Sequence, residues 1–279
     1  MKDKRKTKKQ KKPLVLTERD RAIILSVYEN RFLRRDQIQR LFFSKSSLPA
    51  CNMRLKKLYE HRFLDRLYKP VAVGSSQAVY ALDKRGAEIV ALILGRPINQ
   101  INWKRDHNRV EFLFLEHTLA VSEFKVNLDL ALARSDVADL IFYRRGTKSL
   151  NTRVSDPRGK KKYLVVAPDA FFGIKNHKGR SYFFLEADLG TETLKRFQEK
   201  TIAYKEYWKT GKYTQTYGFK NFRVLTITES RKRLENLMEA TRKVGGKNMF
   251  LFSILDSSQK PPFVQIWQSP VENSYLNIF

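Results

Sequence analysis

Acidic side chains follow two apolar runs in the C-terminal half of the chain. One run, residues 163–168, ends directly before Asp169, and the other, residues 182–187, carries Glu186 and ends directly before Asp188. Side chains alternate across a strand, so Glu186 and Asp188 point to one face. Carboxylates gathered at one place repel each other unless a cation lies between them. The spacing therefore predicts a divalent-metal site with Asp169, Glu186 and Asp188 as ligands.

The predicted cofactor is Mg²⁺ or Mn²⁺. Mg²⁺ binds one or two carboxylates together with water and phosphate oxygens, and metal-assisted phosphodiester cleavage uses such a pocket beside a basic groove. The site requires that residues 173–179 form the hairpin loop between the two acid-bearing strands, so that Asp169 approaches Glu186. The alternative from spacing alone is that the three acids lie on the surface at strand ends.

A helix expected over residues 192–210 adds a cation to this predicted site. Phe197, Lys200 and Tyr204 recur at spacings of three and four residues and share one face. Lys200 on that face could stabilise the negative charge of a reacting phosphate or orient an attacking water. The alternative is a lysine whose aliphatic stem packs on Phe197 and Tyr204 while its ammonium group stays in water.

A large excess of positive charge indicates a polyanionic partner. The chain has 55 Lys and Arg against 28 Asp and Glu, which gives a formal net charge of +27. Charge of this size favours association with nucleic acid. Residues 1–13 form a basic tail that we expect to be disordered. Hydrophobic residues make up 42% of the chain, which is enough for ordinary cores, so the remainder is expected to be globular.

Cysteine content and hydropathy bear on the cellular compartment. Cys51 is the only cysteine, which excludes an internal disulfide and the usual multi-cysteine zinc sites. No apolar run approaches the length of a membrane span, and no signal peptide is recognisable after the basic start. We therefore expect a cytoplasmic protein that has no membrane partner.

Residues 14–96 have the pattern of a winged-helix DNA-binding domain. Apolar residues at helical spacing predict three short helices, and two strand-like runs joined by a loop follow them. These five elements are expected over residues 17–30, 35–43, 49–62, 63–68 and 77–82. A further helix over residues 83–94 closes the domain before Gly95.

The third of these helices is the expected DNA-reading element. In helix-turn-helix proteins such a helix enters the major groove, where its polar side chains meet base edges and phosphates, and a wing contacts the backbone. The alternative is a winged-helix module that makes protein contacts alone. The residues predicted to bind DNA are Asn52, Arg54, Lys56, Lys57 and His61 on the helix and Arg66, Lys69 and Ser75 on the wing.

Residues 97–279 are expected to form a second domain of the α/β class. A long helix over residues 103–133 leads into alternating strands and helices, an order that favours a mixed sheet flanked by helices. Helices are expected over residues 192–210 and 229–244. Strands are expected over residues 139–143, 163–168, 182–187, 222–228, 249–255 and 264–268.

These features together resemble the replication-relaxation family. The resemblance rests on residues 168–170, 184–188 and 190–192, followed by Lys200 and Tyr204 and preceded by a winged helix. The family occurs on bacterial plasmids and integrative elements. Its second domain is similar to the PD-(D/E)XK restriction-endonuclease-like fold, and some members act as relaxases that nick an origin of transfer.

The resemblance implies roles for individual residues. Asp169 and Glu186 would be metal ligands. Asp188 stands where many such nucleases have the motif lysine, and Lys200 would supply that charge from the helix. The aspartate in place of lysine departs from the family pattern. The chain also lacks the His-x-His triplet of tyrosine-type relaxases and the Gly-x-x-x-x-Gly-Lys loop that binds nucleotide phosphates.

Two functions follow from this sequence. The first is a DNA-binding protein of a mobile element that acts in replication initiation or in origin relaxation, with catalysis by Asp169, Glu186, Asp188 and Lys200. The second is a non-catalytic replication or transcription regulator with a degenerate nuclease-like domain. Both predict double-stranded DNA as partner, with single-stranded DNA and a second copy of the chain as further candidates. Duplex RNA binding is a third, weaker interpretation.

Overall fold

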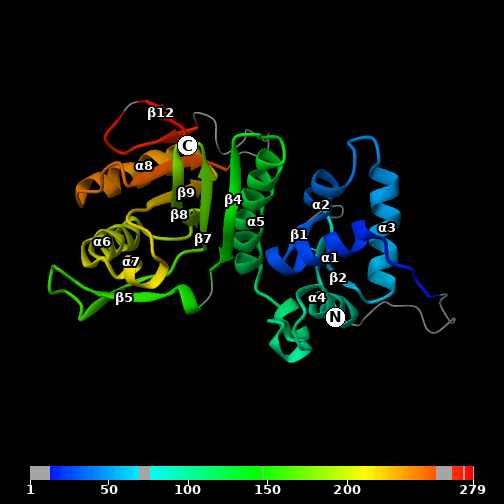
Figure 1. Ribbon diagram of the computed structural model, residues 1–279. Helices are drawn as coiled ribbons and strands as arrows, with labels where there is room; N and C mark the ends of the chain where they lie inside the picture. Colours follow the sequence, from blue (N-terminus) through cyan, green and yellow to red (C-terminus); the bar gives the residue numbers. More distant parts are fainter. Residues whose placement is uncertain (1–12, 69–75, 147, 256–265, 273, 279) are drawn as a thin grey trace. The chain divides into compact units, whose positions relative to one another are not determined.

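The computed structural model describes residues 13–68, 76–146, 148–255, 266–272 and 274–278. The protein is of the α/β class, as predicted, and its contacts divide the chain into two compact units, residues 1–122 and 123–279. We call them unit 1 and unit 2 and describe each by itself (Figure 1).

Unit 1 combines short helices with a three-stranded antiparallel sheet in the order β1-β3-β2. Helix α1 begins where Thr17 caps its N-terminus, because the Thr17 hydroxyl and the Asp20 carboxylate exchange hydrogen bonds with each other's backbone amides. The elements in chain order are α1 (Glu18–Asn30), β1 (Leu33–Arg34), α2 (Arg35–Phe42), α3 (Leu48–Glu60), β2 (Leu64–Leu67), β3 (Val79–Leu82) and α4 (Lys84–Leu94).

The core of unit 1 fixes the face that α3 presents to solvent. Cys51, Leu55 and Leu58 of α3 are buried at spacings of three and four residues, as expected for one face of a helix. The thiol of Cys51 is reduced, and burial raises its pKa to about 11. The opposite face of α3 stays exposed. The predicted helices over residues 17–30, 35–43, 49–62 and 83–94 are confirmed to within two residues at either end.

The helix predicted over residues 103–133 is shorter in the structure. Two 3₁₀ turns, Ile98–Gln100 and Arg105–Asn108, precede α5, which runs from Phe112 to Leu132. The indole of Trp103 and the side-chain amide of Asn108 both donate hydrogen bonds to the Leu82 carbonyl oxygen, at 3.0 and 2.9 Å. These bonds hold the segment on the small sheet and oppose helix formation there. The division between the two units falls inside α5.

Unit 2 is built on a seven-stranded mixed sheet in the order β12-β11-β10-β9-β8-β7-β4. Strands β8, β9 and β10 are parallel, and the other neighbours are antiparallel. A separate two-stranded sheet pairs β5 with β6. The strands are β4 (Ala138–Arg145), β5 (Thr152–Ser155), β6 (Tyr163–Val166), β7 (Ala170–Asn176), β8 (Gly179–Asp188), β9 (Arg223–Thr228), β10 (Phe250–Ile254), β11 (Trp267–Gln268) and β12 (Tyr275–Leu276).

The predicted hairpin loop over residues 173–179 is wrong. Residues Ala170–Asn176 form β7, which pairs with β8 along its whole length, and the loop is confined to the turn between Asn176 and Gly179. Gly173 lies inside this strand. Its position requires a glycine, because a Cβ there would come within 2.9 Å of the Phe142 ring and 3.2 Å of the Tyr182 ring. The strand expected over residues 163–168 belongs instead to the small β5–β6 sheet.

Helices cover both faces of the large sheet. On one face, α6 (Leu194–Thr210), α7 (Lys212–Tyr217) and α8 (Arg231–Lys243) enclose an aromatic-rich core that includes Phe171, Phe184 and Phe222. On the other face, Phe124 of α5 packs on Phe172 and Trp267. In Figure 1, α6 and α8 lie together beside β8 and β9. None of the helices in the described residues is long and apolar enough to cross a membrane.

Candidate functional site

Acidic side chains gather where β7 begins and β8 ends. Asp169 precedes β7, its backbone amide donates to the Leu185 carbonyl oxygen at 2.9 Å, and its carboxylate accepts a hydrogen bond from the Ala187 amide at 2.8 Å. Asp169 therefore lies beside Glu186. Gly146 lies against the backbone at Asp169, where only glycine fits, because a Cβ there would lie 2.3 Å from the Pro168 carbonyl oxygen. The predicted proximity of Asp169 and Glu186 is present, although the connection between their strands differs.

Glu186 is compensated by two side chains of α6. Its carboxylate lies 3.0 Å from Lys200 Nζ and 2.5 Å from the Tyr204 hydroxyl, which donates to it. Lys200 also pairs with Glu192 at 3.0 Å. Glu186 is only 3% exposed, so these partners are what makes its burial tolerable. The predicted position of Lys200 on the sheet-facing side of α6 is thus the position seen in the structure.

The environment of this cluster shifts its titration. Burial raises the pKa of the Glu186 carboxyl, the neighbouring charge of Asp169 adds to the rise, and Lys200 and Tyr204 offset only part of it. Burial alone would lower the pKa of Lys200, yet Glu186 and Glu192 together hold it above its usual value. Burial and then the Glu186 charge raise the pKa of Tyr204 far above its ordinary range, so its phenol stays protonated as a donor.

Asp188 is held by a different cation. The guanidinium of Arg233 donates to both carboxylate oxygens, at 2.7 and 2.8 Å, and the Gly190 amide donates to one of them at 2.9 Å. Arg233 also donates to the Glu192 carbonyl oxygen at 2.5 Å. This bidentate pair fixes the start of α8 against the end of β8.

Sequence reasoning missed Arg233 and gave Glu192 no role in the site. A signal for Arg233 was present, because α8 follows β9, and β9 lies parallel to β8. Helices that follow parallel strands begin at the same edge of the sheet at which those strands end. The first turn of α8 was therefore bound to lie close to Asp188.

The carboxylates do not fit the predicted three-ligand metal site. Both oxygens of Glu186 accept hydrogen bonds from α6 side chains, and both oxygens of Asp188 accept them from Arg233. Among the residues described, no three or more His, Cys, Asp or Glu side chains are placed to hold one metal ion. What stays a prediction is binding of Mg²⁺ or Mn²⁺ by Asp169 and Glu186 alone.

Two buried hydroxyls line this end of the sheet without a partner. Thr226 and Thr228 of β9 stand in register with Glu186 and Asp188 of β8. Their Oγ1 atoms are buried, and no described side chain or backbone group binds them. Polar atoms of this kind usually bind an ordered water.

The predicted DNA-binding residues of unit 1 separate into two groups. Asn52, Lys56 and Lys57 lie on the exposed face of α3, as expected. Arg54 does not, because its guanidinium binds both oxygens of the fully buried Asp20 and also donates to the Val15 carbonyl oxygen at 3.0 Å. The role predicted for Arg54 in DNA contact is therefore replaced by a structural one that joins α3 to α1.

The other predicted contacts lie at the end of α3 and on β2. His61 donates through Nδ1 to the Lys57 carbonyl oxygen at 2.9 Å. The Arg66 guanidinium lies over the ring of Tyr59, 4.5 Å from its centroid, and 5.3 Å from that of Tyr68. Lys69 and Ser75 lie outside the described residues.

Met53 is an apolar residue of α3, yet it is 62% exposed. Met53 lies on α3 between Asn52 and Arg54, next to the exposed Lys56 and Lys57. The helical period explains this exposure, since Cys51, Leu55 and Leu58 define the buried face of α3 and residue 53 lies outside it.

The comparisons with known proteins agree with these features. The family model described as replication-relaxation matches residues 25–222, which include α3, Asp169, Glu186 and Lys200. The chain belongs to the replication-relaxation family. No curated protein matches this family member closely enough to be reported. Membership connects the protein with replication and relaxation, and the resemblance inferred from the sequence is confirmed.

Proposed function

We propose that this replication-relaxation family member binds double-stranded DNA through unit 1 and acts at an origin of a mobile element. The order of α1, α2 and α3 in unit 1, together with its β1-β3-β2 sheet, supports a winged-helix module. In such modules the third helix enters the major groove. Helix α3 would occupy that place.

The observation that carries this proposal is the exposed polar face of α3. Asn52, Lys56 and Lys57 are exposed, and within the described part of the chain neither lysine forms an ion pair. Arg54, which lies between Asn52 and Lys56 on the same helix, forms an ion pair with Asp20. A side-chain amide can read an adenine edge through two hydrogen bonds, and lysines bind phosphates or guanine. The exposed Met53 adds an apolar group that could contact a thymine methyl.

The charge of the whole chain supports the same proposal. A net charge of +27 attracts a polyanion over distances beyond direct contact, and the attraction weakens as salt is added. Binding through phosphates releases counterions, so affinity should fall steeply with salt concentration.

The test is selection of bound sequences from a pool of random DNA duplexes by the full-length protein. The proposal expects enrichment of a defined sequence, which the protein then binds more tightly than a scrambled duplex. Asn52→Ala should relax the preference at one or two base pairs, because each lost bidentate contact removes roughly 1–3 kcal/mol of discrimination. Recovery of no preferred sequence would contradict a base-reading role for α3.

The matched control is Lys84→Gln, which alters an exposed polar residue of unit 1 outside α3. This variant should select the same sequence as the unchanged protein. Equal relaxation by Asn52→Ala and Lys84→Gln would show that α3 has no special part in recognition. Circular dichroism of both variants checks that unit 1 keeps its helices.

For unit 2 we propose a non-catalytic role, in which the acidic cluster stabilises the fold. The support is that Glu186 and Asp188 are each bound by a cation of a neighbouring helix. A second candidate function, phosphodiester cleavage, rests on one observation, the closeness of Asp169, Glu186 and Lys200. Incubation of supercoiled plasmid that carries the selected sequence with Mg²⁺ or Mn²⁺ separates the two. Unchanged topology is expected, and nicking that Asp169→Asn abolishes would establish cleavage.

A further inference from the structure

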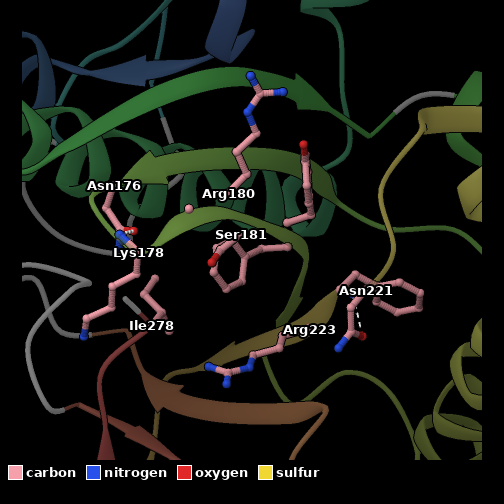
Figure 2. A pocket seen from close by; sticks show the side chains of 11 residues that line it. Asn176, Lys178, Arg180, Ser181, Asn221, Arg223 and Ile278 are labelled. Atoms are coloured by element: carbon pink, nitrogen blue, oxygen red, sulfur yellow. Dashed lines mark hydrogen bonds between the residues drawn. The ribbon is translucent and has the colours of Figure 1, made fainter.

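A pocket with a volume of about 300 Å³ lies at the end of the large sheet opposite to the acidic cluster (Figure 2). Its wall is formed by the β7–β8 turn, the first residues of β8 and β9, and Ile278 near the end of the chain. No residue assigned to DNA binding or to the acidic cluster contributes to it. We call it the hairpin pocket.

The hairpin pocket is cationic. Lys178, Arg180 and Arg223 line it, and no Asp or Glu among the described residues does. In the ranges that the structure describes, none of these three side chains forms an ion pair, in contrast to Arg233 and Lys200 of the same unit. Three exposed like charges repel one another, which is tolerated at a surface where an anion can bind between them.

Neutral groups of the pocket add hydrogen-bond donors. Asn221 accepts hydrogen bonds through Oδ1 from the Phe222 amide at 2.8 Å and the Trp208 indole at 3.1 Å. Its amide nitrogen is therefore left to donate to a ligand. Tyr182 lines the pocket as well, but its ring is stacked on Phe219, with centroids 4.4 Å apart. Because the Tyr182 ring already packs on Phe219 in the core, the pocket is better suited to a phosphate than to a stacked base.

The cations are spread along a rim, and they do not converge on one point. In Figure 2, Lys178 and Arg223 extend on the same side of β8, whereas Arg180 extends on the opposite side. A single phosphate could not contact all three. A strand with a phosphate at every nucleotide could, because successive charges would follow the rim.

We propose that the hairpin pocket binds the phosphate backbone of single-stranded DNA. Its volume of about 300 Å³ is at the lower limit of ligand pockets and suits one phosphate with part of its sugar, and a duplex is too wide to enter. The proposal rests on the function proposed above, because a separated strand arises when a duplex origin is opened. It adds a second contact for DNA that is independent of α3.

The test compares two triple variants of the full-length protein that remove the same charge. One carries Lys178→Gln, Arg180→Gln and Arg223→Gln, and the other carries changes to glutamine at three exposed lysines of unit 2 that do not line the pocket. These control positions are Lys212, Lys232 and Lys247. Fluorescence anisotropy measures binding to oligo-dT of about 16 nucleotides, a length that such sites accommodate. Thermal unfolding checks both variants.

The pocket variant should bind oligo-dT roughly tenfold more weakly than the control variant, and its slope of log affinity against log salt should be shallower by about 2. Thymidine monophosphate, which carries one phosphate, should not compete with the oligonucleotide for the unchanged protein. Equal losses in both variants would overturn the proposal, since they would reflect net charge alone. Effective competition by the mononucleotide would overturn the extended-strand arrangement.

A binding measurement with the selected DNA duplex tests this proposal independently of the function proposed for α3. The pocket variant should keep the affinity of the control variant for the selected duplex. If the unchanged protein selects no duplex but binds oligo-dT through the pocket, the proposed function fails and the pocket assignment stands. If duplex selection succeeds and the two triple variants bind oligo-dT equally, the pocket assignment fails alone.

Discussion

The charged side chains at the two ends of β8 differ in burial and in ion pairing. At its C-terminal end, Glu186 and Asp188 are buried, and each is bound by a cation from a neighbouring helix. At its N-terminal end, Arg180 and the nearby Lys178 are exposed beside Arg223, and no Asp or Glu of the described chain lines the same pocket. Buried charges must be paired to be tolerated, whereas exposed ones need not be. Pairing therefore distinguishes the residues that hold the fold from the residues proposed to bind a ligand.

The same contrast occurs along α3 in unit 1. Arg54 is bound to the buried Asp20, and Lys56 and Lys57 are exposed. The carboxylate Asp20 keeps a pKa below its usual value, because the hydrogen bonds from Arg54 and Thr17 outweigh the effect of burial. In both units, the cations proposed to bind DNA are ones for which the described residues provide no carboxylate partner.

The largest expected effect comes from breaking the Arg233–Asp188 pair. Arg233→Met leaves the buried Asp188 charge without its bidentate partner, and it should lower the free energy of unfolding by about 3 kcal/mol. Urea denaturation measures this. The neighbouring exposed Lys232→Met serves as control and should change stability little. Addition of Asp188→Asn to Arg233→Met should recover part of the loss, and a fully additive pair of effects would argue against direct coupling.

A smaller loss is expected for Lys200→Met. The ion pair with Glu186 has a buried partner, but the Lys200 side chain is 32% exposed, so solvent screens part of its contribution. We expect a decrease of about 1–2 kcal/mol in the free energy of unfolding at neutral pH. Lys195→Met, an exposed position five residues earlier on α6, is the matched control. Equal effects at the two positions would show that the pair does not stabilise unit 2.

The pH dependence of stability tests the environment of Glu186 itself. Burial raises the pKa of this carboxyl above its ordinary value of 4.5, so the folded protein holds its proton more tightly than the unfolded chain does. The corresponding stability is complete below pH 4.5 and is lost as pH rises through the folded pKa. Denaturant titrations across this window should show a smaller decline for Glu186→Gln than for the unchanged protein. Parallel profiles would mean that Glu186 titrates normally.

The smallest effect is expected at the other end of β8. The triple change of Lys178, Arg180 and Arg223 to glutamine removes exposed cations that form no described ion pair, so the free energy of unfolding should change by less than about 0.5 kcal/mol. Thermal unfolding measures it. A loss comparable to that of Arg233→Met would mean that these cations hold the fold, and the contrast between the two ends would disappear.

Local pattern was sufficient for most of the fold. The apolar residues at helical spacing predicted α1, α2 and α3, which the structure contains. Strand β7 was missed because Gly173 and the polar turn after it have the composition of a loop. The strand forms since β4 and β8 pair with it on both sides, which no local pattern reveals.

Tertiary pairing explains the errors in the candidate site. Asp188 was expected to bind a metal, but its partner Arg233 lies 45 residues further along the chain. Arg54 was expected to bind DNA, but Asp20 lies 34 residues before it. Charge type and helical period identify a polar residue and its face. They do not reveal which oppositely charged residue, distant in the sequence, will form an ion pair with it.

The salt dependence of duplex binding tests the account most directly. The unchanged protein and a variant with Lys56→Gln and Lys57→Gln are titrated with the selected duplex over a range of salt concentrations, with Lys84→Gln and Arg96→Gln as the charge-matched control. Loss of two phosphate contacts should make the slope of log affinity against log salt shallower by about 2, and the control should leave it unchanged. Identical slopes in all three proteins would contradict DNA binding through α3.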